Sequence, residues 1–237
     1  MTSYGLVYYT NNFPEEKIFL ACQKQLNKCM EQWKFPIYSI SKKPIDFGIN
    51  TVVDFENSLL SMYKQIYIGL EQCQTDVIFL IEHDLLYHPS HFDTAKLDYL
   101  PDHFYYNRNQ WHVQPETGKT VTYLHNDTSM MSSRRDLLMK HIKRAIEVNE
   151  IGFHSSYGIS PPKGIPPEEA RKNHYDTYMS ETPVVDIRHS KTFTRVRMTK
   201  DQFRSENSRR GWTESDSIPN WPGKTLGRFY DWLGEVV

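Results

Sequence analysis

Residues 76–84 read Asp-Val-Ile-Phe-Leu-Ile-Glu-His-Asp and contain the most hydrophobic strand-forming run of the chain. The apolar residues of this run follow one another without polar alternation, which predicts a central strand of a parallel sheet, buried on both faces. The run ends abruptly in Glu82-His83-Asp84. Because ligands of open parallel sheets bind outside the carboxyl ends of the strands, we expect this acidic cluster to lie at a binding site.

The segments before this run alternate between strand and helix patterns. Residues 5–9 and 35–40 predict strands, and a further short strand is expected within 46–54. Residues 15–32 and 58–74 carry apolar side chains at three- and four-residue spacing, which is typical of helices with one buried face. This order predicts an α/β fold with a Rossmann-like, mostly parallel central sheet flanked by helices.

The pattern changes after residue 90. Residues 104–113, 120–124 and 183–187 predict strands of a smaller antiparallel region, and residues 134–149 predict an amphipathic helix. Residues 152–167 are rich in glycine and proline and predict a long irregular loop, a kind of segment that often binds ligands.

Composition excludes several classes of protein. The chain has 237 residues, of which 38% are hydrophobic and 14% aromatic, so it can bury a sizeable core and does not resemble a disordered chain. Its three cysteines form no CxxC pair, which argues against a disulfide framework or a zinc ribbon. Since neither a membrane-spanning run nor a signal-peptide pattern is found, we expect a soluble, cytoplasmic protein that does not contact a membrane.

The net charge of −1 conceals an asymmetry along the chain. Residues 1–125 hold 10 basic and 14 acidic residues, whereas residues 126–237 hold 18 and 15. Residues 186–210 alone hold 8 basic and 3 acidic residues, an excess of five positive charges. Such a segment could meet an anionic partner, or it could simply solvate the surface.

Two acidic residues bracket one histidine at the end of the hydrophobic run. Glu82 and Asp84 form an oxygen-rich pair that suits Mg²⁺ or Mn²⁺, and such an ion can neutralise a departing diphosphate. A solvated strand end that caps the next helix is the alternative. His189 ends a second short strand between Arg188 and Lys191, and it is a candidate for metal binding, for phosphate contact or for a structural hydrogen bond.

The first half of the chain resembles the nucleotide-binding half of GT-A fold glycosyltransferases of the family-2 type. The similarity rests on a first strand that ends in Tyr8-Tyr9-Thr10-Asn11, and on Gly69-Leu70-Glu71 leading into the strand that ends in Glu82-His83-Asp84. The last three residues are similar to the family's Asp-x-Asp motif, with glutamate in place of the first aspartate. The resemblance covers roughly residues 4–190. It implies transfer of a sugar from a nucleotide-diphosphate donor to a hydroxyl acceptor, assisted by Mn²⁺ or Mg²⁺.

The same resemblance implies roles for individual residues. It makes Asp84 the direct metal ligand and His189 a second one, while Glu82 would touch either the ion or the ribose. The implied contacts to the nucleotide sugar are Tyr9, Thr10, Asn11, Lys42, Asp46, Lys64, Glu82 and His83. Lys64 fits a helix surface equally well. Tyr106, Trp111, Trp212 and Trp221 could stack on a sugar or base, or belong to the core.

An inverting transferase needs a carboxylate that takes the proton of the acceptor hydroxyl. Glu169 and Glu168 follow the proline-rich loop and are the first candidates, although acids at a helix N-terminus are the alternative reading. Glu181 and Asp127 come next, and a retaining enzyme would need none of these residues as a base.

The resemblance also predicts the domain organisation. Residues 1–198 would form one catalytic domain, with a nucleotide-sugar half at 1–100 and an acceptor half at 101–198, and residues 199–237 would pack on it as an extension. More narrowly, Glu82–Phe92 and Asp186–His189 resemble phage and microbial proteins related to enzymes that glucosylate hydroxymethylated thymine in DNA. This narrower similarity implies DNA binding by residues 186–210. A non-catalytic nucleic-acid-binding module, or a transferase acting on a saccharide or a protein, remains the alternative.

Overall fold

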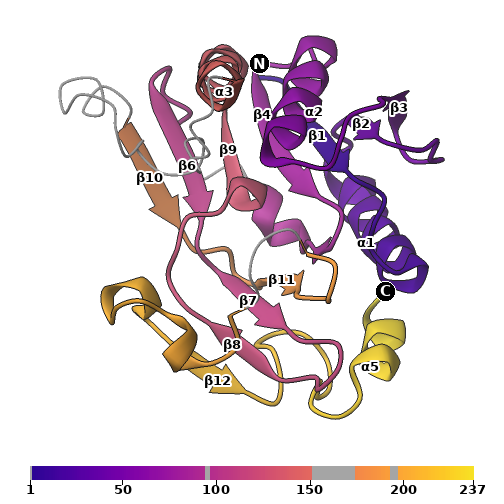
Figure 1. Cartoon of the computed structure of the whole chain (residues 1–237), viewed down its shortest axis with the longest axis vertical. Coiled ribbons are helices and arrows are strands. Elements are labelled where there is room, and N and C mark those ends of the chain that lie inside the picture. The colour runs from indigo at the N-terminus through magenta and orange to yellow at the C-terminus, as the bar shows by residue number, and fades with distance from the viewer. Residues whose placement is uncertain (1, 94–96, 151–173, 193–196) are drawn as a thin grey trace.

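The computed structural model describes residues 2–93, 97–150, 174–192 and 197–237 (Figure 1). Its main sheet has seven strands in the order β10-β6-β9-β4-β1-β2-β3. The strands are β1 (Tyr4–Thr10), β2 (Ile37–Ser41), β3 (Ile49–Val52), β4 (Val77–Glu82), β6 (His103–Asn107), β9 (Met131–Arg134) and β10 (His174–Tyr178). Parallel pairing joins β4, β1, β2 and β3 in turn, and β9 runs antiparallel between β4 and β6. The mixed α/β fold with a mainly parallel central sheet is therefore confirmed.

Helices cover both faces of this sheet, which explains why the central strand is hydrophobic throughout. Phe79 and Ile81 of β4 share a core with α1 (Glu16–Trp33). Ile78 and Leu80 point to the opposite core, formed with α2 (Leu59–Gln72) and α3 (Arg135–Glu150). All four side chains are fully buried.

A second sheet of five strands stands below the first in Figure 1, in the order β12-β8-β7-β11-β5. Its strands are β5 (Leu85–Leu86), β7 (Gln110–Val113), β8 (Thr120–Thr122), β11 (Val184–Ile187) and β12 (Thr213–Ser215). Its pairings are antiparallel except for the parallel pair of β7 and β11.

The single strand expected at 104–113 is wrong, because the chain leaves one sheet and enters the other within it. β6 belongs to the main sheet and β7 to the second sheet. At the crossing, Asn109 donates its backbone N–H to the Asn107 side chain, and Arg108 donates its own to the carbonyl of Tyr178. These bonds satisfy two backbone N–H groups that would otherwise pair with a neighbouring strand if 104–113 were one continuous strand.

The C-terminal segment is anchored at two places. Trp232 and Leu233 of α5 (Phe229–Val236) pack against Ile18 and Cys22 of α1. At the second place Gly118 has φ +68°, and a Cβ there would stand 1.8 Å from the carbonyl oxygen of residue 225. Only glycine fits such a close approach, so the turn before β8 is shaped to receive the C-terminal segment.

In the part of the chain that the structure describes, no helix combines the length and the hydrophobicity needed to cross a membrane.

Candidate active site

An open cleft lies at the carboxyl ends of β1 and β4, bordered by the start of α2 and by residues 188–192. Its empty volume, including the part open to solvent, is about 970 Å³, at the upper end of the range usual for small-molecule sites. Seven residues that the sequence predicted for donor or metal binding line it together: Tyr9, Thr10, Asn11, Lys42, Glu82, His83 and Asp84.

Other predicted residues lie elsewhere. The Lys64 ammonium is 2.9 Å from the Glu150 carboxylate, so this lysine bridges α2 and α3 outside the cleft. Asp46 and Glu181 are exposed and do not line the cleft. Glu168 and Glu169 lie outside the described residues.

Two residues outside the predicted donor and metal sets, Asn12 and Gln65, shape the side of the cleft formed by the ends of β1 and β2. Asn12 has φ +60°, and its side-chain oxygen accepts the backbone N–H groups of Lys42 and Lys43 at 2.8 and 3.0 Å. The buried Gln65 donates to the carbonyl oxygen of Thr10 at 2.9 Å. These bonds tie the ends of β1 and β2 to each other and to α2. Asn12 had a sequence signal, since asparagine tolerates the left-handed conformation in turns.

His83, Asp84 and His189 form a group that could hold a metal ion, with their ligand atoms all within 4.8 Å of one another. Asp84 Oδ2 lies 3.5 Å from His189 Nε2. Asp84 is 7% exposed and His189 6%, yet Asp84 Oδ1 and His189 Nε2 have no hydrogen-bond partner among the described residues. Buried polar atoms without partners are costly, and a cation would satisfy both. A carboxylate with two imidazoles is a mixed oxygen and nitrogen ligand set, which suits a first-row transition-metal ion better than Mg²⁺ or Ca²⁺.

The protonation of the two histidines bears on this fit. Burial lowers the pKa of His83 more than the nearby Asp84 raises it, which favours the neutral imidazole that binds metals. The Nδ1 atom of His189 accepts the backbone N–H of Lys191 at 3.2 Å. A neutral imidazole that binds an ion through Nε2 carries its proton on Nδ1. Nδ1 could then no longer accept the Lys191 N–H, so ion binding would break this hydrogen bond.

Glu82 is adjacent in sequence to the possible metal-binding group of His83, Asp84 and His189, but it is not a member of that group. Its Oε1 accepts the hydroxyl of Tyr9 at 2.9 Å. Burial raises the pKa of Glu82 well above its usual value, and the charges of Asp84 and Asp127 raise that pKa further. The cleft therefore concentrates negative charge, and an added cation would lower the cost of ionising Glu82.

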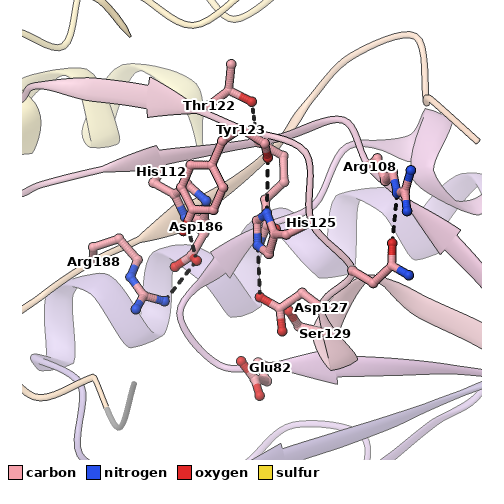
Figure 2. A network of polar contacts seen from close by, with 12 residues as sticks. Glu82, Arg108, His112, Thr122, Tyr123, His125, Asp127, Ser129, Asp186 and Arg188 are labelled. Atoms are coloured by element: carbon pink, nitrogen blue, oxygen red, sulfur yellow. Dashed lines mark hydrogen bonds and ion pairs between the residues drawn. The ribbon is translucent and has the colours of Figure 1, made fainter. Parts of the chain in front are cut away.

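A buried network supports the basic side of the cleft (Figure 2). Asp186 Oδ2 accepts His112 Nδ1 at 2.9 Å and Arg188 Nη1 at 3.0 Å. Burial alone would raise the pKa of Asp186, but the Arg188 charge and the His112 hydrogen bond hold that pKa well below its usual value. Arg188, which lines the cleft with Lys191, is held in place through this carboxylate.

Asp127 enters the cleft from the segment before β9. Its Oδ2 lies 3.7 Å from His125 Nε2, as Figure 2 shows. Burial would raise the pKa of Asp127, but the nearby His125 and Arg188 outweigh it and lower that pKa. Asp127 is one of the candidate bases predicted from the sequence, whereas His125 is not. The signal for both was a His-x-Asp spacing just after a strand.

The start of α2 adds a positive dipole end to the cleft. Asn57, Ser58 and Ser61 line the cleft there, and Ser58 Oγ caps the helix by accepting the Ser61 N–H at 3.0 Å. The free N–H groups of a helix start favour anions.

The aromatic residues considered as stacking platforms have structural roles. Tyr106 and Trp111 are buried, and Trp221 donates its indole N–H to the carbonyl of Pro183. Trp212 stacks on Tyr123 at 5.9 Å between ring centroids.

No protein-family model matches the chain, and no curated protein matches it in sequence. Among solved structures it is similar to a glycosyltransferase involved in glycosylation of the PBCV-1 major capsid, with 11% identity and a TM-score of 0.46 over 78% of this chain and 92% of that one. It is also similar to S. aureus TarS residues 1–349 in complex with UDP-GlcNAc, with 10% identity and a TM-score of 0.45 over 82% of this chain. The match spans 62% of that TarS chain. At such low identity no residue role transfers by alignment, and the function is argued from the cleft itself.

Proposed function

We propose that the cleft binds a nucleotide-diphosphate sugar together with a divalent cation and transfers the sugar to a hydroxyl acceptor, as an inverting glycosyltransferase does. The observation that carries this proposal is a pair of buried atoms without a hydrogen-bond partner among the described residues, Asp84 Oδ1 just after the central strand β4 and His189 Nε2 just after β11. A buried carboxylate oxygen without a hydrogen-bond partner is retained at a cost, and cation binding is the simplest chemistry that offsets it.

The proposed ion would be held by Asp84 and His189, with His83 as a third ligand. When bound, it would neutralise the donor diphosphate and so make the nucleoside diphosphate a better leaving group. The chain's own groups act in the same direction. Arg188, Lys191 and the start of α2 supply positive charge along the cleft.

The donor would occupy the side of the cleft formed by Tyr9, Thr10, Asn11 and Lys42. Asn12 and Gln65 hold that wall, so the main chain there is preorganised for a polar ligand. Glu82, with the hydroxyl of Tyr9 already on one oxygen, suits a hydrogen bond to a ribose or sugar hydroxyl better than an ion contact.

Two of the basic residues of segment 186–210 pair with acidic residues of the same segment, which are already counted in its excess of five positive charges. Arg188 pairs with Asp186 and Arg209 with Glu206. Because Arg188 and Lys191 face the cleft, we assign their charge to the donor rather than to a DNA backbone. Glycosylation of a hydroxymethylated DNA base is a narrower form of the same proposal, and salt-dependent binding of duplex DNA would favour it.

The first experiment measures thermal stability with Mn²⁺ and a panel of UDP-, GDP- and TDP-sugars. A donor that binds the native state should raise the melting temperature in the presence of Mn²⁺. Asp84→Asn should remove both the Mn²⁺ effect and the donor effect. The control Glu31→Gln changes an exposed carboxylate on α1 and should keep both. If no nucleotide sugar stabilises the native chain, the proposal is wrong.

A further inference from the structure

Asp127 is a carboxylate of the cleft to which the proposed function gives no role in binding the donor or the cation. The acidic residues that line the cleft in the described part of the chain are Glu56, Glu82, Asp84 and Asp127. Asp84 belongs to the group that could hold an ion, and Glu82 accepts the Tyr9 hydroxyl. Glu56 is exposed and precedes α2 on the donor side. A base for the acceptor must be ionised and accessible, and this leaves Asp127.

The local chain directs the Asp127 carboxylate away from its own backbone. Asp127 stands just before a short 3-10 turn at Thr128–Met130, a position where aspartate often caps. Here the side chain makes no capping bond, and only the Asp127 carbonyl accepts the Met130 N–H. The carboxylate, 27% exposed, is therefore available to the cleft.

His125 is oriented so that it can hold this carboxylate in place. Its Nδ1 lies 3.1 Å from the Tyr123 carbonyl oxygen. Since a carbonyl oxygen can only accept, Nδ1 carries a proton. When Nε2 is protonated as well, the imidazolium forms an ion pair with Asp127 Oδ2, which lies 3.7 Å away. The imidazole also packs against the rings of Tyr123 and His112, with centroids 4.6 and 5.2 Å away. A ring fixed on two sides limits the orientations open to the aspartate.

We propose that Asp127 is the catalytic base of this cleft and that His125 is its positioning residue. The proposal rests on the proposed function and deepens it. In the step, the acceptor hydroxyl gives its proton to an Asp127 carboxylate oxygen while its oxygen forms a bond to the sugar C1. The bond from C1 to the β-phosphate oxygen breaks, its electron pair leaves with the nucleoside diphosphate, and the configuration at C1 inverts.

The test uses the full chain and water as the acceptor, with the nucleotide sugar that stabilises it in the presence of Mn²⁺. Asp127→Asn should lower kcat for donor hydrolysis by about 100-fold or more, with Mn²⁺ affinity and donor-induced stabilisation unchanged. Asp136→Asn is the matched control, because Asp136 is fully exposed on α3. It should leave hydrolysis at the wild-type rate.

Azide separates a catalytic role from a structural one. Azide attacks C1 without losing a proton, so it should restore turnover of Asp127→Ala by tenfold or more and yield the glycosyl azide, with no acceleration of the wild type. His125→Gln should lower kcat about tenfold at an unchanged donor KM.

The outcomes distinguish the two proposals. Wild-type hydrolysis that persists in Asp127→Asn, or loss that azide does not restore, overturns the role of Asp127 and leaves sugar transfer standing. A wild-type chain that neither binds nor hydrolyses any donor overturns both.

Discussion

Asp186 and Arg188, at the end of β11, are joined by an ion pair of 3.0 Å, and their side chains are 3% and 12% exposed. The same carboxylate oxygen accepts His112 Nδ1 at 2.9 Å. The guanidinium that faces the cleft is thus attached to a carboxylate that solvent hardly reaches.

Replacing Asp186 should destabilise the protein strongly. Asp186→Asn leaves the buried charge of Arg188 uncompensated, so the free energy of unfolding at pH 7 should fall by about 3 kcal/mol. The low pKa of Asp186 makes its contribution fully present above about pH 4, the range in which the unfolded residue is ionised, and lost as pH falls through the native pKa. Urea unfolding should therefore show a smaller difference in the free energy of unfolding between the wild type and Asp186→Asn at pH 3 than at pH 7. Asp231→Asn, at an exposed site on α5, should change little; an equal loss there would contradict the argument.

His91 should make the native state sensitive to acid. It is 1% exposed, and burial lowers its pKa to about 3. Below about pH 6.5 the unfolded chain binds a proton that the native chain does not, so the free energy of unfolding should fall as pH falls from 6.5 towards 3. The total effect is on the order of 5 kcal/mol, at about 1.4 kcal/mol per pKa unit.

Urea unfolding at several pH values would measure this effect. His91→Asn keeps an acceptor for the Asn107 amide, which lies 3.0 Å from His91 Nδ1, and should flatten the dependence between pH 6.5 and 4. An unchanged slope would show that other groups cause the acid sensitivity.

Metal binding should appear as added stability even without a donor. Mn²⁺ at 100 times its dissociation constant should raise the free energy of unfolding by about 2.7 kcal/mol, and EDTA should reverse the gain. His189→Ala and Asp84→Asn should each weaken the gain, because each removes a proposed ligand. A gain that survives in both variants would place the ion elsewhere.

Two glycines should respond to alanine with opposite signs. Gly118→Ala forces a Cβ against the residue 225 carbonyl at a positive φ. The free energy of unfolding should fall by about 2 kcal/mol and the melting temperature by several degrees.

In Gly234→Ala the new Cβ meets no atom within 4 Å, and alanine forms helices better than glycine, so the free energy of unfolding should rise by about 0.5–1 kcal/mol. Thermal melts of the two variants test both signs.

The part of the cleft at the ends of β1 and β4 could be predicted because it depends on local pattern. An unbroken apolar run identified β4, and polar residues at the ends of β1 and β4 were expected to meet because parallel strands end at one edge of the sheet. The burial of β4 on both faces agrees with that interpretation.

The side of the cleft near Asp127 and Arg188 depends on strand pairings that no local pattern encodes. β9 reads Met-Ser-Ser-Arg, which lacks β-branched and aromatic residues, and it is a strand because β4 and β6 pair with it on both sides. Likewise Asp186 meets His112 only because β11 lies parallel to β7 in the second sheet. Asp46 follows β2 as expected, yet the turn there leaves it exposed outside the cleft.

The packing of α5 on α1 joins residues that are far apart in the chain. Ile18 and Cys22 of α1 share a buried apolar cluster with Trp232 and Leu233, and the Tyr230 hydroxyl donates to Glu15 at 2.7 Å. Removal of residues 229–236 would therefore uncover an apolar face of α1, and exposed apolar surface of this kind promotes aggregation.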